Sequence, residues 1–179
     1  VVAQCLIRNL ELGFFNNLTA MFPRSPITAQ RLFGERLFEK RVSGKRGIGG
    51  RLEANSVNYH NYYGKSDALA GPNDALYLWD RWFGKDRTRV PDALSEPRKQ
   101  EMRRFFAAWE QLLERPILNK NNSLNTCADV VADALPHAWF LCMRRDPVYL
   151  AQALLIARRD IHGDEHIPYG VHPPGSDLS

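Results

Sequence analysis

The chain has 179 residues, of which 44% are hydrophobic and 11% aromatic. This length and composition suffice for one sizeable core and exclude a disordered chain. The net charge of +4 is compatible with an anionic ligand but too mild to identify one, and we predict neither a nucleic-acid partner nor, without a run of about 18 apolar residues, a membrane span.

The three cysteines, Cys5, Cys127 and Cys142, lie far apart within apolar segments. An odd number of widely spaced cysteines in such segments indicates buried, reduced thiols and not a disulfide framework. Reduced thiols predict a reducing compartment, the cytoplasm.

The first predicted helix runs from the beginning of the chain to about Leu12, with Gly13 as its C-cap. No Ser, Thr, Asp or Asn caps its start, so we expect that the intact protein begins further upstream. Ser25 and Pro26 form a cap followed by proline at the first helical position, which predicts a second helix covering Ala29 to Phe38.

Two glycine-containing stretches follow, Ser43–Arg51 and Gly64-Lys65-Ser66. The first favours a flexible, solvated loop over a phosphate cradle, because no strand precedes it. The second imitates the end of a nucleotide-binding P-loop, but Tyr59 stands where that motif requires glycine. Residues 55–63, rich in aromatic and amide side chains, either line a substrate pocket or pack onto the core.

Two amphipathic helices are predicted next. Pro72-Asn73-Asp74 begins a short helix, and Ser95-Glu96-Pro97 caps a longer one that reaches about Glu114. Their apolar side chains recur every three or four positions, so we expect the stripes to face the core and the longer helix to cover a sheet. The stripes consist of Leu76, Trp79, Trp82 and Phe83 in the first helix and of Met102, Phe105, Phe106, Trp109, Leu112 and Leu113 in the second.

The segment Arg115–Asp164 has the pattern strand, polar loop, helix, strand, charged turn, helix. Apolar runs at Pro116–Asn119 and Ala138–Met143 predict the strands, and Thr126–Leu135 predicts the helix between them. Such a unit implies parallel strands joined by a right-handed crossover. Ligands bind at the carboxyl ends of parallel strands, and here Lys120 and Arg145 occupy those ends, so we expect an anionic ligand.

The stretch LPHAWFLCMRRDPVYLAQALL resembles the segment with which sulfotransferases hold the 3′-phosphate of their donor, 3′-phosphoadenosine 5′-phosphosulfate. Arg145-Asp146-Pro147 matches the family's Arg, acidic or amide residue and Pro after a strand. PILNKNNSLN is similar to the strand that ends in Lys near the transferring sulfonate, which corresponds to Lys120. The resemblance is specific over about Pro116 to Asp160 and diffuse elsewhere.

The resemblance implies an α/β fold, a three-layer, P-loop-related architecture with a parallel sheet flanked by helices, of which residues 1–179 form one partial domain. Ala153 stands where the family has a serine that contacts the phosphate. The family's glycine-rich donor-binding loop would precede Val1, and a later phosphate-binding segment would follow Ser179. We therefore expect a fragment that is inactive alone.

The reaction implied is transfer of a sulfonate from the donor to an acceptor hydroxyl or amine. By the resemblance, Lys120 neutralises charge near the bridging oxygen and Arg145 binds the 3′-phosphate, while Asn122 adds a neutral donor. His60 is the candidate general base because it lies in the aromatic loop and titrates near neutrality. The acceptor and the oligomeric state are not specified by the sequence.

Two alternatives to an active sulfotransferase stay open. One is a non-catalytic module that keeps the fold and binds an anion or a partner, which Ala153 favours. The other is a nucleotide kinase of related fold, which requires an upstream P-loop. A metal site at His162 and His166 is not expected, since Gly163 and Pro168 interrupt the helix that would align them.

Overall fold

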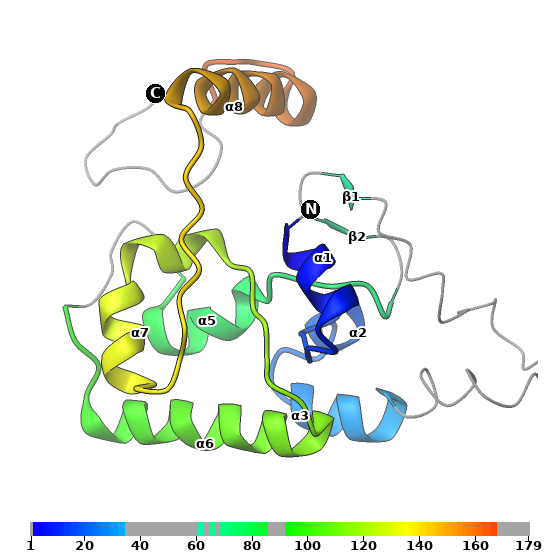
Figure 1. Ribbon diagram of the computed structural model, residues 1–179, viewed down its shortest axis with the longest axis vertical. Coiled ribbons are helices and arrows are strands. Elements are labelled where there is room, and N and C mark those ends of the chain that lie inside the picture. Colours follow the sequence, from blue (N-terminus) through cyan, green and yellow to red (C-terminus); the bar gives the residue numbers. More distant parts are fainter. Residues whose placement is uncertain (1, 35–60, 63–64, 67–68, 86–91, 168–179) are drawn as a thin grey trace, which may run out of the picture.

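The computed structural model describes residues 2–34, 61–62, 65–66, 69–85 and 92–167. Helices predominate in this part of the chain (Figure 1). The elements are α1 (Val2–Asn9), α2 (Asn17–Ala20), α3 (Pro26–Ala29), the π-helical turn η1 (Gln30–Gly34), β1 (Asn61–Tyr62), β2 (Lys65–Ser66), α5 (Leu76–Phe83), α6 (Glu96–Leu113), the 3-10 turn η2 (Asn122–Thr126), α7 (Ala128–Ala134) and α8 (Pro147–His162).

The predicted three-layer parallel sheet is wrong for the described residues. The strands there are β1 and β2, two residues each, which pair antiparallel. Pro116–Asn119 forms one isolated parallel bridge: Gly13 N–H donates to the Pro116 carbonyl, and Leu118 N–H donates to the Gly13 carbonyl, both at 2.8 Å. The backbone N–H and C=O groups of a strand need hydrogen-bond partners on a neighbouring strand. Among the described residues, Gly13 is the one residue that pairs with this apolar run.

The second predicted strand, Ala138–Met143, is extended but unpaired (Figure 1). Among the described residues, no backbone hydrogen bond joins Trp139–Arg145 to another segment. The apolar pattern predicted the extended conformation correctly, but it contains no information on which segment pairs with it.

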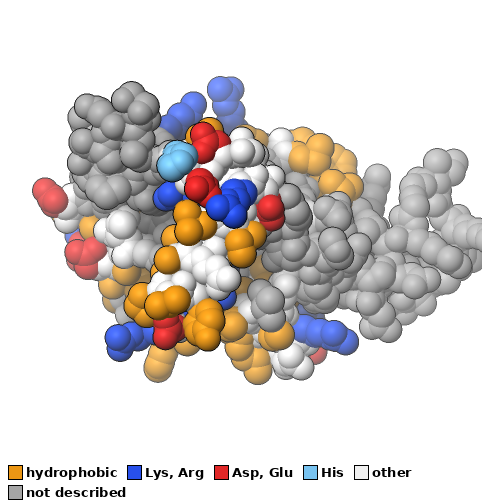
Figure 2. Space-filling model, turned by 90° about the horizontal axis from the view of Figure 1, so that it is seen from above, with side chains coloured by type: hydrophobic (Ala, Val, Ile, Leu, Met, Phe, Trp, Pro, Cys, Tyr) orange, Lys and Arg blue, Asp and Glu red, His pale blue; other side chains and the backbone are white. Residues whose placement is uncertain are grey.

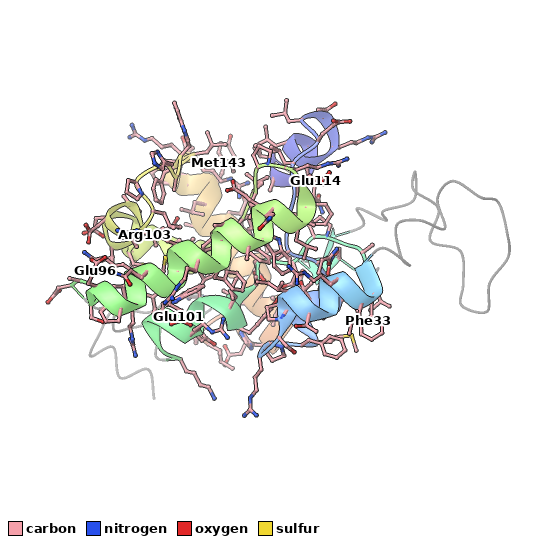
Figure 3. All side chains as sticks on the ribbon, turned by 90° about the horizontal axis from the view of Figure 1, so that it is seen from below. Phe33, Glu96, Glu101, Arg103, Glu114 and Met143 are labelled. Carbon is pink, nitrogen blue, oxygen red and sulfur yellow. The ribbon has the colours of Figure 1, made fainter. Side chains whose placement is uncertain are left out.

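The core lies between α5, α6 and α7. Seen from below, α6 crosses the view from Glu96 to Glu114, with η1 and Phe33 on one side (Figure 3). The apolar stripes predicted for α5 and α6 are confirmed as core, but α6 packs against helices and not against a sheet. The fully or nearly fully buried side chains of this cluster are Phe15, Ala75, Leu78, Trp79, Trp82, Leu94, Met102, Phe105, Trp109, Cys127, Val130, Val131 and Ala134.

Two local expectations near the beginning of the chain differ in outcome. The start of the second helix at Ser25-Pro26 is confirmed, because α3 begins at Pro26. Gly13 does not cap the first helix, since α1 ends at Asn9. It lies instead against the end of α6, where an added Cβ would meet Leu113 Cδ1 at 2.7 Å, so its missing side chain permits the close approach to Leu113 while its backbone pairs with Ile117.

The expectation of three buried cysteines is also wrong. All three thiols are free, but only Cys127 is buried, while Cys5 and Cys142 are exposed. Cys142 is exposed, and the extended segment that contains it has no neighbouring strand among the described residues, while Cys5 lies on the outer side of α1.

After α7 the chain leaves this core. Pro136 and His137 form a turn, and residues 138–146 then run as an extended segment to α8, which lies apart from α5, α6 and α7 (Figure 1). We call residues 136–162 the arm. All side chains from 136 to 152 are exposed, and within α8 only Ala157 is buried. Seen from above, hydrophobic side chains gather over α8, and charged side chains lie toward one end of this group (Figure 2).

Candidate functional site

Lys120 lies at the end of the extended segment Pro116–Asn119, which is attached to the core at two places. At its beginning, the backbone of Gly13 pairs with it. At its end, the Asn119 side chain accepts a hydrogen bond from Trp79 Nε1 at 2.9 Å and donates one to the Asp74 carbonyl at 3.3 Å. The backbone that carries Lys120 is therefore attached to α5.

The loop after Asn119 presents two of the predicted donor-binding side chains. Lys120 and Asn122 are both exposed, while Asn121 between them is buried. The Asn121 carbonyl accepts from Leu124 N–H at 3.3 Å, which begins the tight turn η2 before α7. The structure thus brings Lys120 and Asn122 together in one short loop, as their positions in the sequence require.

Arg145 lies at the other end of the arm's extended segment, immediately before α8. The helix begins as predicted: Asp146 is the N-cap, Pro147 is the first residue, and Asp146 Oδ1 accepts from Val148 N–H at 2.8 Å. Arg145 is exposed. The free N–H groups at this end attract an anion, although the Asp146 carboxylate already satisfies one of them.

The two cations occupy corresponding ends of two extended segments. In Figure 1 both segments rise away from α6, and α7 lies between them in the chain. This order is the predicted one, but no hydrogen bond or ion pair between described residues joins Arg145 to Lys120 or Asn122. The structure therefore retains the connection and direction of the predicted unit without its closure into a sheet.

The sequence pattern assigns two other positions to the predicted site, His60 and Ala153. His60, the candidate general base, lies outside the described residues. Ala153 is half-buried in α8, and this helix contains no serine or threonine to replace the hydroxyl that the resemblance implies at that position.

Burial raises the pKa of the Cys127 thiol, and the negative charge of Asp129 raises it further. Burial also raises the pKa of Tyr77, against a smaller opposite effect of the Thr19 side chain. Both groups are therefore neutral at pH 7, and Cys127 is not an activated nucleophile.

The described part of the chain offers neither a metal site nor a membrane-spanning helix. No group of three or more His, Cys, Asp or Glu side chains in it is arranged to hold a metal ion. Near the two histidines, Glu165 is occupied by Arg159, whose Nε donates to Oε2 at 2.6 Å. None of the described helices combines the length and the apolar character that a membrane span needs.

Sequence reasoning overlooked the role of Asn119 and Trp79. Asn119 ends a predicted strand and Trp79 belongs to the apolar stripe of a predicted helix, but they are forty residues apart and no local pattern links them. One signal in the sequence indicates this contact. Asn119 is an amide at the last position of an apolar run, so its side chain lies next to the core and needs hydrogen-bond partners there.

Comparison of the chain with models of protein families, with curated proteins and with solved structures gave no match. The likeness to sulfotransferases therefore depends on the motif residues around Lys120 and Arg145 alone.

Proposed function

We propose that this chain provides the donor-binding side chains of an enzyme that transfers a sulfonate from 3′-phosphoadenosine 5′-phosphosulfate to an acceptor hydroxyl or amine. The observation that supports this best is the Arg145-Asp146-Pro147 turn. It combines an exposed guanidinium with the capped beginning of α8, directly after an extended segment. A guanidinium beside a helix N-terminus suits the doubly charged 3′-phosphate.

In the proposed reaction, the acceptor oxygen or nitrogen forms a bond to sulfur while the bond between sulfur and the bridging phosphate oxygen breaks. The bonding electrons remain on the 5′-phosphate, which leaves as part of 3′,5′-adenosine bisphosphate, and the acceptor proton passes to a base. Such transfers depend on positioning and charge stabilisation. Lys120 would offset the charge that develops on the bridging oxygen, Asn122 would donate to the sulfonate, and His60 is the candidate base.

A cytoplasmic location is supported by the three free thiols, which a reducing compartment preserves. The acceptor is a hydroxyl or amine of unspecified class, because the residues that would select it do not belong to the resemblance.

Isothermal titration of the full-length protein with 3′,5′-adenosine bisphosphate tests the proposal. We expect saturable binding that weakens by roughly tenfold or more in Arg145→Ala, since a charge-assisted bidentate contact is lost. Arg144→Ala is the matched control, because Arg144 is the adjacent exposed arginine and lies outside the motif. Absence of binding, or equal weakening by both substitutions, would contradict the assignment of Arg145.

A second candidate function, binding of an extended polypeptide, is favoured by the exposure of the arm. Trp139 is 98% exposed, and Leu141 and Met143 are exposed by more than half. Monomeric proteins rarely expose contiguous apolar patches above a few hundred Å² unless they bind something. An extended segment whose backbone groups have no partner among the described residues can accept another strand by main-chain hydrogen bonding.

A second copy of the chain can serve as the probe for this candidate, because each copy carries the same segment. Light scattering across a concentration series, combined with hydrogen exchange of residues 139–145, should reveal association and protection that rise together. Leu141→Lys should abolish both, whereas Val148→Lys, an exposed apolar position of α8, is the control. A monomer with fast exchange at every concentration would exclude pairing between copies.

A further inference from the structure

The side-chain amide of Asn119 forms a bridge between the Lys120 loop and α5. We call its two hydrogen bonds, from Trp79 Nε1 to Oδ1 and from Nδ2 to the Asp74 carbonyl, the amide bridge. An indole nitrogen can only donate and a carbonyl can only accept, so the orientation of the amide is fixed by its partners. Both hydrogen bonds are partly buried, which makes their loss costly.

The partners of the amide bridge are themselves held firmly. Trp79 is buried and contacts Trp82, Phe83 and Phe106, with ring centroids 5.5 to 6.1 Å apart. Asp74 precedes a left-handed residue, Ala75, whose N–H donates to Asn73 Oδ1 at 2.8 Å. The bridge therefore attaches the loop to a rigid part of the core.

Lys120 is fixed at its backbone and free at its side chain. Asn119 anchors it on one side, and Asn121, which is buried, anchors it on the other. Among the described residues no carboxylate lies within ion-pair distance of the Lys120 ammonium. A cation on a fixed backbone, without a counter-ion in the described part of the chain, is arranged for an anion from solution.

We infer that Asn119 is a positioning residue for Lys120: the amide bridge sets the path of the backbone so that the ammonium projects toward the sulfonate end of the donor. This inference rests on the proposed function. According to this inference, Asn119 acts through Lys120 and does not contact the donor itself, because the core already binds both ends of the Asn119 amide.

A double-mutant cycle measured by titration with 3′-phosphoadenosine 5′-phosphosulfate distinguishes positioning from general stabilisation. Asn119→Ala should weaken donor binding by roughly tenfold in the native background, since a small displacement of a charged contact has a large effect. In the Lys120→Ala background the same substitution should have almost no effect. Asn125→Ala, an exposed asparagine of η2, is the control and should leave affinity unchanged.

Trp79→Phe provides a second way to break the bridge. It removes the indole N–H but keeps an aromatic ring in the core, so the cycle can be completed even where Asn119→Ala unfolds the chain. Additive losses, or an unchanged affinity in Asn119→Ala and Trp79→Phe while Lys120→Ala is weakened, would overturn the positioning role alone. A full-length native protein that does not bind the donor would overturn the proposed function, and with it this inference.

Discussion

Arg103 of α6 caps the carboxyl end of α7: its Nε donates to the Ala134 carbonyl at 2.8 Å. The last carbonyls of a helix lack intrahelical partners, and a cation there also opposes the negative end of the helix dipole. This contact joins α6 to α7, which carries the buried core residues Val130 and Val131.

Arg103→Ala should therefore lower the free energy of unfolding by about 1 kcal/mol, since the carbonyl loses its partner while the exposed part of the guanidinium contributes little. Urea denaturation followed by circular dichroism measures it. Glu96→Gln is the matched control: it removes the exposed ion pair with Arg103, 3.1 Å long, and should change stability by less than about 0.5 kcal/mol. Equal losses in both variants would assign the effect to the ion pair.

Phe15 should be among the most sensitive positions of the core. Its ring is fully buried and lies 4.7 Å from the Trp109 centroid and 6.3 Å from that of Phe105. Phe15→Ala should cost about 3 to 5 kcal/mol, because a large cavity remains among rings that cannot collapse. Phe22→Ala, at a partly exposed position, should cost far less, and denaturant midpoints compare the two.

Stability should fall at alkaline pH. Because burial raises the pKa of Cys127 above 9.0 and that of Tyr77 above 10.0, both groups ionise first in the unfolded chain as the pH rises. The stability that these two neutral groups contribute is fully present below their pKa values in the unfolded chain. It is lost as the pH rises above those values. Thermal melts across this range should show a decline that is shallower in Cys127→Ala but unchanged in Cys142→Ala, which removes an exposed thiol. An identical decline in both variants would exclude Cys127 as a cause.

Loss of the α8 N-cap should destabilise the first turn of α8 without changing the stability of the rest of the fold. Asp146→Ala removes the hydrogen bond to Val148 N–H and should speed hydrogen exchange in the first turn of α8 by several-fold, equivalent to about 1 kcal/mol. Asp146→Asn retains an acceptor oxygen and should exchange almost as the native chain does. Because the arm has few contacts with the core, global unfolding should change in neither variant.

Local signals predicted local structure well. Ser95-Glu96-Pro97 and the apolar spacing gave the beginning and the buried face of α6, and Asp146-Pro147 gave the beginning of α8. These features depend on residues within one or two turns of each other. The Lys120 loop was predicted for the same reason, because its polar residues are contiguous.

Long-range relationships could not be predicted in this way. Gly13 has the usual signature of a helix cap, yet its position is decided by Ile117, and Cys142 was expected to be buried because its strand was expected to have neighbours. Pairing between strands depends on segments that are distant in sequence. The pattern of an apolar run is the same whether or not a partner strand is present. The Trp79–Asn119 hydrogen bond was missed on the same ground.

The exposure of Trp139 gives the molecule a natural optical reporter. Of the four tryptophans, Trp79, Trp82 and Trp109 are buried, so a soluble quencher such as iodide reaches Trp139 selectively. This indole lies six residues before Arg145, on the segment that any added strand would cover. Its emission should therefore shift to shorter wavelength and resist quenching when the arm is covered, which allows occupancy of the arm to be followed in the native chain without a label.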